Sequence, residues 1–249
     1  MSSYTSLEAR LHDLFWAEED SPELAWMDQL LRDHPGRALE VGSGSGRLLL
    51  PLLQNGHAIE GLESSSDMID LCRAAATDLG LDPIIHHGDM QTIRLPGTYA
   101  SIHLPAFTLQ LATDPAATLK NLHRHLDPDD LLYLTVFVPL AELHGELPEG
   151  EWFKDQRLKL ADGSIAEVTT RFELDRAKRI LKREHHYQLR SAEALQEHRS
   201  SQTIRWFPPR ELSTLLEKIG FTVDNAVAEF DEDLQVDDDA QIITVMARA

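Results

Sequence analysis

The glycine-rich stretch RALEVGSGSGRLLLPLLQNGHAIEGLE, from Arg37 to Glu63, constrains this chain more than any other feature. Three glycines alternate with other residues between a short apolar run and a leucine-rich run. A strand that enters a glycine turn and continues into a helix forms a ligand-binding loop, because glycine lets the backbone approach a ligand and a helix start offers free N–H groups. The stretch therefore predicts a strand, a ligand-binding turn and a helix of an α/β fold.

The spacing of the glycines narrows the class of ligand. A dinucleotide-binding loop has the pattern G-x-G-x-x-G, which would require glycine at position 47, where this chain has Arg47. The sequence instead reads Glu40-x-Gly42-x-Gly44-x-Gly46. The Glu40 carboxylate repels phosphate and attracts a cation, and Glu63 ends the second predicted strand, where a carboxylate can accept both hydroxyls of a ribose. We infer a ligand with a ribose and an amine or sulfonium but no phosphate, which describes S-adenosylmethionine.

Strand-like and helix-like segments alternate along most of the chain. Helices are predicted at 7–15, 22–31, 47–54, 66–79, 114–126 and 208–219, and strands in RALEV, HAIEGLE, PIIHHGD, YASIHLP, LLYLTVFVP, FTVDNAVAEF and QIITVMA. This alternation predicts an α/β fold with a mostly parallel sheet and helices on both faces. The acidic stretch at 231–239 is predicted to be a solvated loop between the last two strands.

Residues 150–206 break this alternation. IAEVTTRFELD and RILKREHHYQLR alternate in residue type and are joined by RAK, which predicts an antiparallel hairpin, with EALQEHRSSQTIRWF as a third strand. The segment from Glu151 to Arg210 has 13 Lys or Arg against 9 Asp or Glu, although the whole chain carries −19. An insertion after a late strand lies near the carboxyl ends of the strands, where ligands bind. We therefore expect a β-rich substrate lid.

Composition limits the partners and the compartment. The formal charge of −19 opposes binding to nucleic acid and to anionic membranes. Cys72 is the single cysteine, which suits a reducing compartment, and the charged first twenty residues contain no apolar signal-peptide core. The longest apolar run, LLYLTVFVPLA, is too short to span a membrane. We expect a cytoplasmic protein of 249 residues, a monomer or homodimer without nucleic-acid or membrane partners.

From about Arg37 to its end the chain resembles the class I S-adenosylmethionine-dependent methyltransferases. The resemblance rests on the glycine motif, the acid at Glu63, the following SSSDMID, the GDM at 88–90, and the segments RWFPPRELSTLLEKIGF and QIITVMARA. The closer likeness is to small-molecule methyltransferases with a β-rich insertion between the fifth strand and the last helix. It implies a Rossmann-like, seven-stranded sheet whose last strand is antiparallel. The expected parts are an N-terminal helical cap at 1–36, a methyltransferase domain at 37–149 and 207–249, and the lid at 150–206.

The resemblance also implies a set of cofactor-binding residues. The residues that line the methionine part of the cofactor in the family match Gly42, Ser43, Gly44 and Gly46. The ribose-binding acid matches Glu63, and the residue that packs near the adenine matches Met68. The contact to the adenine amino group matches Asp89, with Met90 beside it. Glu40 and Pro105 complete the expected cofactor site. The cofactor implied is S-adenosylmethionine, and the product S-adenosylhomocysteine.

The methyl acceptor is expected to be nitrogen, oxygen or carbon of a small molecule. Ala100 stands where the family often has aspartate, and Phe107, Thr108 and Leu111 stand where it often has polar groups. His103, near the end of the fourth strand, is the candidate general base, with a hydrogen-bonded core histidine as the alternative.

The candidate substrate-binding residues would suit an anionic or aromatic acceptor. They are Trp16, Phe107, Arg171, His185, Arg205 and Trp206. A solvated sheet face is the alternative for the arginines, and core packing is the alternative for Trp16. No metal site is expected, because the adjacent histidines at 86–87 and 185–186 face opposite sides of a strand.

Two other functions stay open at this point. An NAD-dependent oxidoreductase is disfavoured by the glycine spacing and by Glu40. A non-catalytic protein that binds S-adenosylmethionine or S-adenosylhomocysteine is kept open by Phe107 and Leu111, which remove polar groups from the expected reaction site.

Overall fold

The computed structural model describes residues 4, 6–16 and 21–249, without the side chains of Ser6, Trp16 and Pro209. The helices are α1 (Ser6–Trp16), α2 (Pro22–Asp33), α3 (Leu49–Gln54), α4 (Ser66–Leu79), the 3-10 turn η1 (Thr108–Leu111), α5 (Pro115–His123), α6 (Leu140–Leu143) and α7 (Pro209–Ile219). The strands are β1 (Ala38–Val41), β2 (Ile59–Glu63), β3 (Ile85–His87), β4 (Tyr99–Leu104), β5 (Leu126–Phe137), β6 (Phe153–Lys159), β7 (Ile165–Asp175), β8 (Ile180–Arg190), β9 (Leu195–Arg205), β10 (Thr222–Ala228), β11 (Asp231–Gln235) and β12 (Ile242–Arg248).

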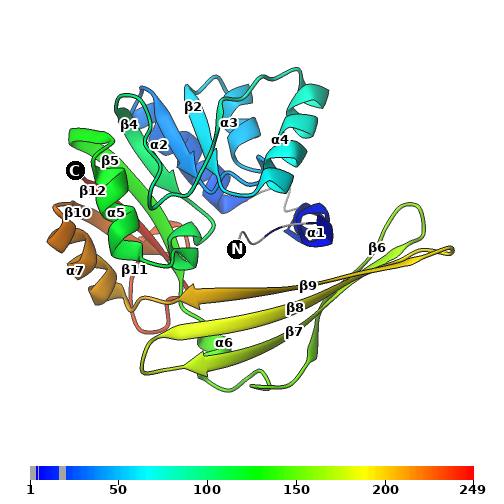
Figure 1. Cartoon of the computed structure of the whole chain (residues 1–249). Coiled ribbons are helices and arrows are strands. Elements are labelled where there is room, and N and C mark those ends of the chain that lie inside the picture. The colour runs from blue at the N-terminus through cyan, green and yellow to red at the C-terminus, as the bar shows by residue number, and fades with distance from the viewer. Residues whose placement is uncertain (1–3, 5, 17–20) are drawn as a thin grey trace.

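The main sheet has the strand order β11-β10-β12-β5-β4-β1-β2-β3 (Figure 1). The five strands from β5 to β3 are parallel, whereas β12 runs antiparallel to both β5 and β10. This arrangement confirms the predicted mostly parallel sheet with an antiparallel last strand. The reversal of strand order between β4 and β1 places the ligand site of such a fold at the carboxyl ends of these two strands.

The main sheet has one strand more than predicted. The residues of β11 belong to the acidic stretch that was predicted to be a loop, and they pair antiparallel with β10. All five side chains of β11 are exposed, so the prediction that they are solvated is correct and the prediction of a loop is wrong. The backbone groups of β10 would otherwise form an open sheet edge, and a short charged edge strand covers them.

Helices cover both faces of the main sheet. On one face α2, α3 and α4 bury an apolar cluster that includes Met27, Leu49 and Ala76. On the other face α5 and α7 pack through residues such as Leu119 and Leu212. Burial on both faces explains why β1 and β2 are buried at every position instead of alternating.

Local signals in the sequence fix the ends of α4, which follows the second strand. The Ser65 side chain accepts a hydrogen bond from the backbone N–H of Met68, which caps the helix start. Gly80 ends the helix in the left-handed conformation, with φ of 69°. The start of α4 is therefore held firmly beside the end of β2.

The insertion forms a second, antiparallel sheet in the order β6-β7-β8-β9. Three strands were predicted, and β6 is a fourth, paired with β7. The buried Gln110 side chain anchors the insertion to the main sheet at both ends, because its amide donates to the backbone oxygens of Phe137 and Arg205. Helix α1 lies between the two sheets and contacts β9 (Figure 1).

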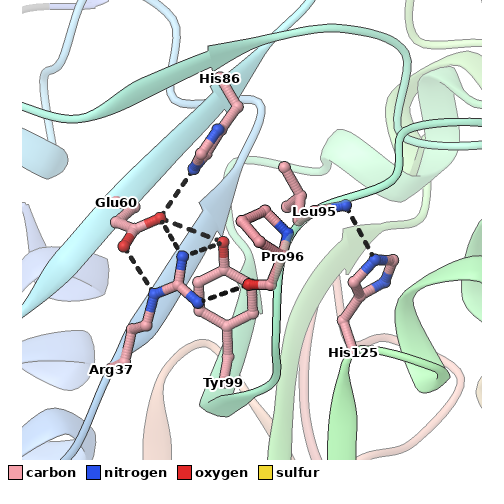
Figure 2. A network of polar contacts seen from close by, with 7 residues as sticks. All are labelled: Arg37, Glu60, His86, Leu95, Pro96, Tyr99 and His125. Carbon is pink, nitrogen blue, oxygen red and sulfur yellow. Dashed lines mark hydrogen bonds and ion pairs between the residues drawn. The ribbon is translucent and has the colours of Figure 1, made fainter.

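A polar network ties together the amino-terminal parts of four parallel strands (Figure 2). The Glu60 carboxylate of β2 accepts hydrogen bonds from Arg37, which precedes β1, and from Tyr99 of β4, and it bonds His86 of β3 at 2.7 Å. Burial raises the pKa of Glu60, but these hydrogen bonds outweigh it and hold the pKa below its usual value. The network lies at the start of the strands and leaves their carboxyl ends free for a ligand.

The part of the chain that the structure describes contains no helix long and apolar enough to cross a membrane.

Candidate functional site

The glycine turn after β1 adopts a backbone that other residues rarely take. Gly42, Gly44 and Gly46 have φ values of 76°, 55° and 90°. A Cβ atom at Gly42 would lie 2.7 Å from the Thr108 side chain, and one at Gly46 would lie 2.6 Å from the sulfur of Cys72. Glycine is required here because the turn is both left-handed and tightly packed. The result is a bare backbone surface at the carboxyl end of β1.

Glu63 lies directly beside this turn, at the carboxyl end of β2. One of its carboxylate oxygens accepts a hydrogen bond of 3.0 Å from the Gly44 N–H. The other oxygen accepts from the backbone N–H groups of Ser64 and Ser65, each at 2.7 Å. These contacts fix the carboxylate between the glycine turn and the start of α4, as the sequence predicted for a ribose-binding acid.

Glu40 is the next-to-last residue of β1, just before the turn, and its side chain is almost completely buried. Among the described residues its Oε2 atom finds no hydrogen-bond partner, and the same holds for the Ser43 hydroxyl. Burial raises the pKa of Glu40 well above its usual value; Glu23 and Glu63 raise it further, and Arg47 opposes the shift. A buried carboxyl without a partner is costly. An ammonium group bound at this point would supply the missing partner, so these residues fit the amino-acid part of S-adenosylmethionine.

The other predicted cofactor residues lie on the neighbouring loops. The Met68 side chain is buried beneath the turn, 3.6 Å from the position of a Cβ at Gly44. Asp89 is exposed after β3, with Met90 half-buried beside it. Pro105 follows β4, and its carbonyl accepts hydrogen bonds from the backbone and side chain of Thr108. The predicted set is thus distributed over the ends of β1 to β4 and the first turn of α4.

The structure places His103 in the core and not at the reaction site. Its side chain is 0% exposed and bonds the Ser101 hydroxyl at 2.9 Å. Burial lowers the pKa of His103 to about 3, and the positive charges of His34 and His57 contribute. A substrate has no access to this ring, so its surroundings are those of the alternative interpretation, a hydrogen-bonded core histidine. We do not retain His103 as a base.

Glu23 of α2 is a functional candidate that the sequence analysis missed. Its buried carboxylate accepts hydrogen bonds from the Ala106 N–H, the Thr135 hydroxyl and the Tyr133 hydroxyl. Ala106 and Phe107 both have positive φ, 50° and 64°, so the loop after β4 is held in a strained conformation. Burial raises the pKa of Glu23, and its hydrogen bonds oppose the shift. Helix α2 thereby holds the loop after β4, which borders the site, in its conformation.

Tyr4 and helix α1, from the region predicted to be a helical cap, reach the cofactor side through contacts that the sequence did not specify. The Ser45 hydroxyl in the glycine turn donates to the Asp13 carboxylate at 2.6 Å, and the Ser65 hydroxyl donates to the Tyr4 carbonyl. The Glu8 carboxylate is buried and accepts from the Ser200 hydroxyl of β9 at 2.9 Å. This segment therefore joins the glycine turn to the inserted sheet.

Two of the predicted substrate-binding arginines face away from the site. Arg171 forms a bidentate pair with Glu184 and lies over the exposed Trp152 ring, and Arg205 donates to the Lys178 carbonyl. Both alternate with buried neighbours along their strands, which places them on the outer face of the inserted sheet. The surroundings of Arg171 and Arg205 are those of the alternative interpretation, a solvated sheet face, because successive strand residues point to opposite faces and the inner face holds their neighbours.

The inner face of the inserted sheet presents Arg183 and His185. The Arg183 guanidinium pairs with the buried Glu142 carboxylate of α6 and lies 5.4 Å from the centre of the Phe137 ring. His185 is buried, bonds the Thr170 hydroxyl at 2.9 Å, and has its pKa lowered by burial and by Arg183. The sequence also offered Arg183 as a candidate for recognising an acidic or aromatic substrate, and it stands two positions before His185 and thus shares its face.

The three aromatic residues predicted to bind substrate, Phe107, Trp206 and Trp16, have different outcomes. Phe107 is half-buried at the end of β4 and makes an edge-on contact with Phe137, 5.0 Å between ring centres. Trp206 is buried in the apolar cluster of Phe172, Leu181 and Ile204, where the insertion meets the main sheet, so it packs and does not face a substrate. The Trp16 side chain lies outside the described residues.

A family model for a methyltransferase domain matches residues 15–226. The chain belongs to this methyltransferase family. Within solved structures, this methyltransferase is similar to an S-adenosylmethionine-dependent methyltransferase of Clostridium acetobutylicum, with a TM-score of 0.78, 13% identity and 96% of each chain covered. It is also similar to the CcbJ methyltransferase of Streptomyces caelestis, with a TM-score of 0.78, 20% identity, and 100% and 98% of the two chains covered. These likenesses confirm the predicted fold.

Among curated proteins, this methyltransferase is similar to the dTDP-3-amino-3,6-dideoxy-alpha-D-glucopyranose N,N-dimethyltransferase of Streptomyces fradiae. The two are 27% identical over 140 residues, which cover 53% of each chain. The match thus spans about half the length of that relative. A solved amino pentose methyltransferase of Micromonospora echinaspora, bound to S-adenosylmethionine, has a TM-score of 0.71 and 18% identity and covers 100% and 99% of the two chains.

Proposed function

We propose that this methyltransferase uses S-adenosylmethionine to methylate the amine nitrogen of a small molecule of the amino-sugar class. One observation carries the cofactor assignment: the buried Glu40 Oε2 atom lacks a described partner at the base of a glycine turn, beside which backbone N–H groups hold the Glu63 carboxylate. The amino-sugar class is supported by the names of the similar proteins from Streptomyces fradiae and Micromonospora echinaspora.

Each part of the cofactor has residues suited to hold it. Glu40 and the Ser43 hydroxyl would bind the amino-acid end, and Glu63 would accept from the ribose hydroxyls. Met68, Asp89 and Met90 would surround the adenine. When bound, S-adenosylmethionine supplies an electrophilic methyl group on a sulfonium. The remaining task of the protein is to align the acceptor with that methyl group and to exclude water.

The surroundings of the acceptor favour nitrogen over oxygen or carbon. A neutral amine is nucleophilic without help, whereas a hydroxyl or carbon acid needs a general base. His103 is inaccessible, and Phe107 and Leu111 occupy positions where the family often has polar groups. A mechanism that uses none of the described residues as a base requires the amine to lose its proton to solvent before it binds. We therefore expect kcat/KM to rise tenfold per pH unit, following deprotonation of the free amine, and to level off above the amine's own pKa.

Calorimetric titration with S-adenosylhomocysteine, with NAD as control, tests the cofactor. Micromolar binding of the first alone supports the proposal, and binding of NAD alone would restore the oxidoreductase. Transfer of a labelled methyl group to methyl glycosides of amino sugars, against the same sugars with hydroxyl in place of the amine, tests the acceptor atom. Methylation of the hydroxyl sugars would overturn the nitrogen assignment. Cofactor binding without transfer to any acceptor would instead support the non-catalytic binding protein.

A further inference from the structure

The charges around the acceptor restrict its class. On the proposed function, the acceptor amine lies between the cofactor and the inner face of the inserted sheet. Tyr4 lies between these two sides: its carbonyl accepts from the Ser65 hydroxyl, and its N–H donates to Glu8, which also accepts from Ser200 of β9. Burial and the Glu8 carboxylate raise the pKa of Tyr4 to about 12, with Glu63 adding to the rise and Arg183 opposing it. Tyr4 therefore lies within electrostatic reach of both the ribose-binding acid and the cation of the inner face.

The inner face offers one permanent cation close to the main sheet. The strand register aligns Phe172 with Arg183 and Gln202, Thr170 with His185 and Ser200, and Val168 with Tyr187 and His198. Within these three described rows, Arg183 is the one Lys or Arg side chain. The neighbouring surface is aromatic, formed by the half-buried Phe107 and Phe137 rings.

Arg183 is already neutralised. Its guanidinium pairs with Glu142, which is only 5% exposed and comes from α6 at the end of the main sheet. A carboxylate buried to this degree holds its cation firmly, because separating the pair would leave a buried charge without a partner. Arg183 also lies over the Phe137 ring, so a carboxylate and an aromatic ring already occupy two sides of its guanidinium.

The other buried charged groups near the site are mostly acids. Glu8, Glu23, Glu40 and Glu63 are all buried, and Arg47 interacts electrostatically with two of them, Glu23 and Glu40. Arginines that a phosphate would need are on the outer face of the sheet, where Arg171 pairs with Glu184 and Arg199 lies over Trp152. A pyrophosphate would thus meet four buried acids, Arg47, which already interacts with two of these acids, and the Arg183 guanidinium, which is paired with Glu142.

We infer that the acceptor is an amine attached to an uncharged molecule with an apolar or aromatic part, such as an amino sugar already joined to an aglycone, and that a nucleoside-diphosphate-linked amino sugar is excluded. The Arg183–Glu142 pair on the inner face sets this preference. The inference rests on the proposed function and separates this chain from the curated relative named for a dTDP-linked sugar.

The test measures binding of thymidine diphosphate by calorimetry in the presence of saturating S-adenosylhomocysteine. We expect no detectable binding to the wild type. E142Q removes the charge that pairs with the Arg183 guanidinium and should make thymidine diphosphate binding detectable, with an affinity at least about tenfold above the detection limit set by the wild type, the effect of one charge-assisted hydrogen bond. The matched control is E184Q, which breaks the Arg171 pair on the outer face in the same way and should leave binding undetectable.

A second measurement compares kcat/KM of the wild type for an aryl glycoside of an amino sugar and for the same sugar linked to thymidine diphosphate. Preference for the nucleotide-linked sugar, or binding of thymidine diphosphate to the wild type, overturns the inference. No gain of binding in a folded E142Q overturns the role of the Arg183–Glu142 pair. If E142Q does not fold, the wild-type comparison decides. Failure of S-adenosylhomocysteine to bind would instead refute the proposed function itself.

Discussion

The glycine turn and the inserted sheet differ in how their residues acquire a role. In the turn, Glu40, Gly42 and Glu63 are positioned by strand ends and by backbone that residues other than glycine rarely adopt, so local sequence defines them. In the inserted sheet, Arg171 and Arg183 stand on the same hairpin with similar neighbours, yet one lies on the outer face and the other on the inner face. The role of a residue can be predicted from sequence when local backbone geometry determines it. It cannot be predicted from sequence when strand register and long-range packing determine it.

Substitutions of Glu23 test whether the loop after β4 depends on hydrogen bonds from α2, which lies outside the glycine motif. Glu23→Ala leaves three donors without their acceptor, and we expect the free energy of unfolding to fall by about 3 kcal/mol. Glu23→Gln retains an acceptor for Ala106 and should lose about 1 kcal/mol. Denaturant unfolding measures both, and amide hydrogen exchange should show faster exchange at 105–108 in the alanine variant. Unchanged exchange there would refute the positioning role.

Gly42→Ala tests the claim that backbone geometry defines the turn. Its φ of 76° and the 2.7 Å approach to Thr108 predict a loss of about 2 to 3 kcal/mol in stability and weaker S-adenosylhomocysteine binding. The matched control is Gly56→Ala, with φ of 88° but no described atom within 4 Å of the new Cβ. It should lose about 1 kcal/mol, for the left-handed conformation alone. Equal losses in thermal or denaturant unfolding would show that packing against Thr108 is unimportant.

Glu63→Ala tests whether the Glu63 carboxylate binds the ribose hydroxyls of the cofactor. We expect S-adenosylhomocysteine to bind more weakly by about 1 to 3 kcal/mol, because charge-assisted hydrogen bonds to the ribose are lost. Calorimetry measures the change, with circular dichroism as the check on folding. A folded variant with wild-type affinity would refute the placement of the ribose.

Glu40 makes stability and binding respond to pH in opposite ways. Its pKa in the folded protein lies well above the ordinary 4.5, so the folded state binds more protons than the unfolded state above pH 4.5. Stability contributed by this group is therefore lost as pH rises from 4.5 towards the folded pKa. Glu40→Gln should be increasingly more stable than the wild type over that range while binding S-adenosylhomocysteine more weakly. Parallel pH profiles of unfolding for the two proteins would contradict a raised pKa.

Binding of the cofactor product should also release a proton. An ammonium beside Glu40 favours its ionised form, so the carboxyl gives up its proton when the ligand binds. Calorimetry in buffers of different ionisation enthalpy measures this release, and Glu40→Gln is the control that should remove it. Equal proton release in both proteins would assign the proton to another group.

Arg171→Gln should have the smallest effect, because its pair with Glu184 is partly exposed on the outer face. We expect stability to change by less than about 0.5 kcal/mol, and kcat/KM to stay unchanged. Arg183→Gln is the comparison on the inner face and should lower kcat/KM through the displaced Phe137 ring. A reversed order of effects would show that the acceptor binds on the outer face.

The sequence by itself determined the α/β fold, the parallel order of the central strands and the glycine turn with its two acids. It could do so because glycine conformations, helix caps and hydrophobic periods are local properties of the chain. The residues from Glu40 to Met68 are close in sequence and are joined by strand–helix connections of short length. Their meeting at one edge of the sheet follows from the topology alone.

Only the tertiary structure decided the acceptor side. His103 is completely buried, with its ring 5.5 Å from the Tyr133 ring of the neighbouring strand, and Glu23 reaches Ala106 from 83 positions away. Glu8 meets Ser200 across 192 positions, and no local pattern encodes such a contact. The strand register likewise determined which face each residue of the insertion occupies. A slip of one residue in the register would move every side chain to the other face. Long-range packing, and not residue type, therefore selected Arg183 over Arg171.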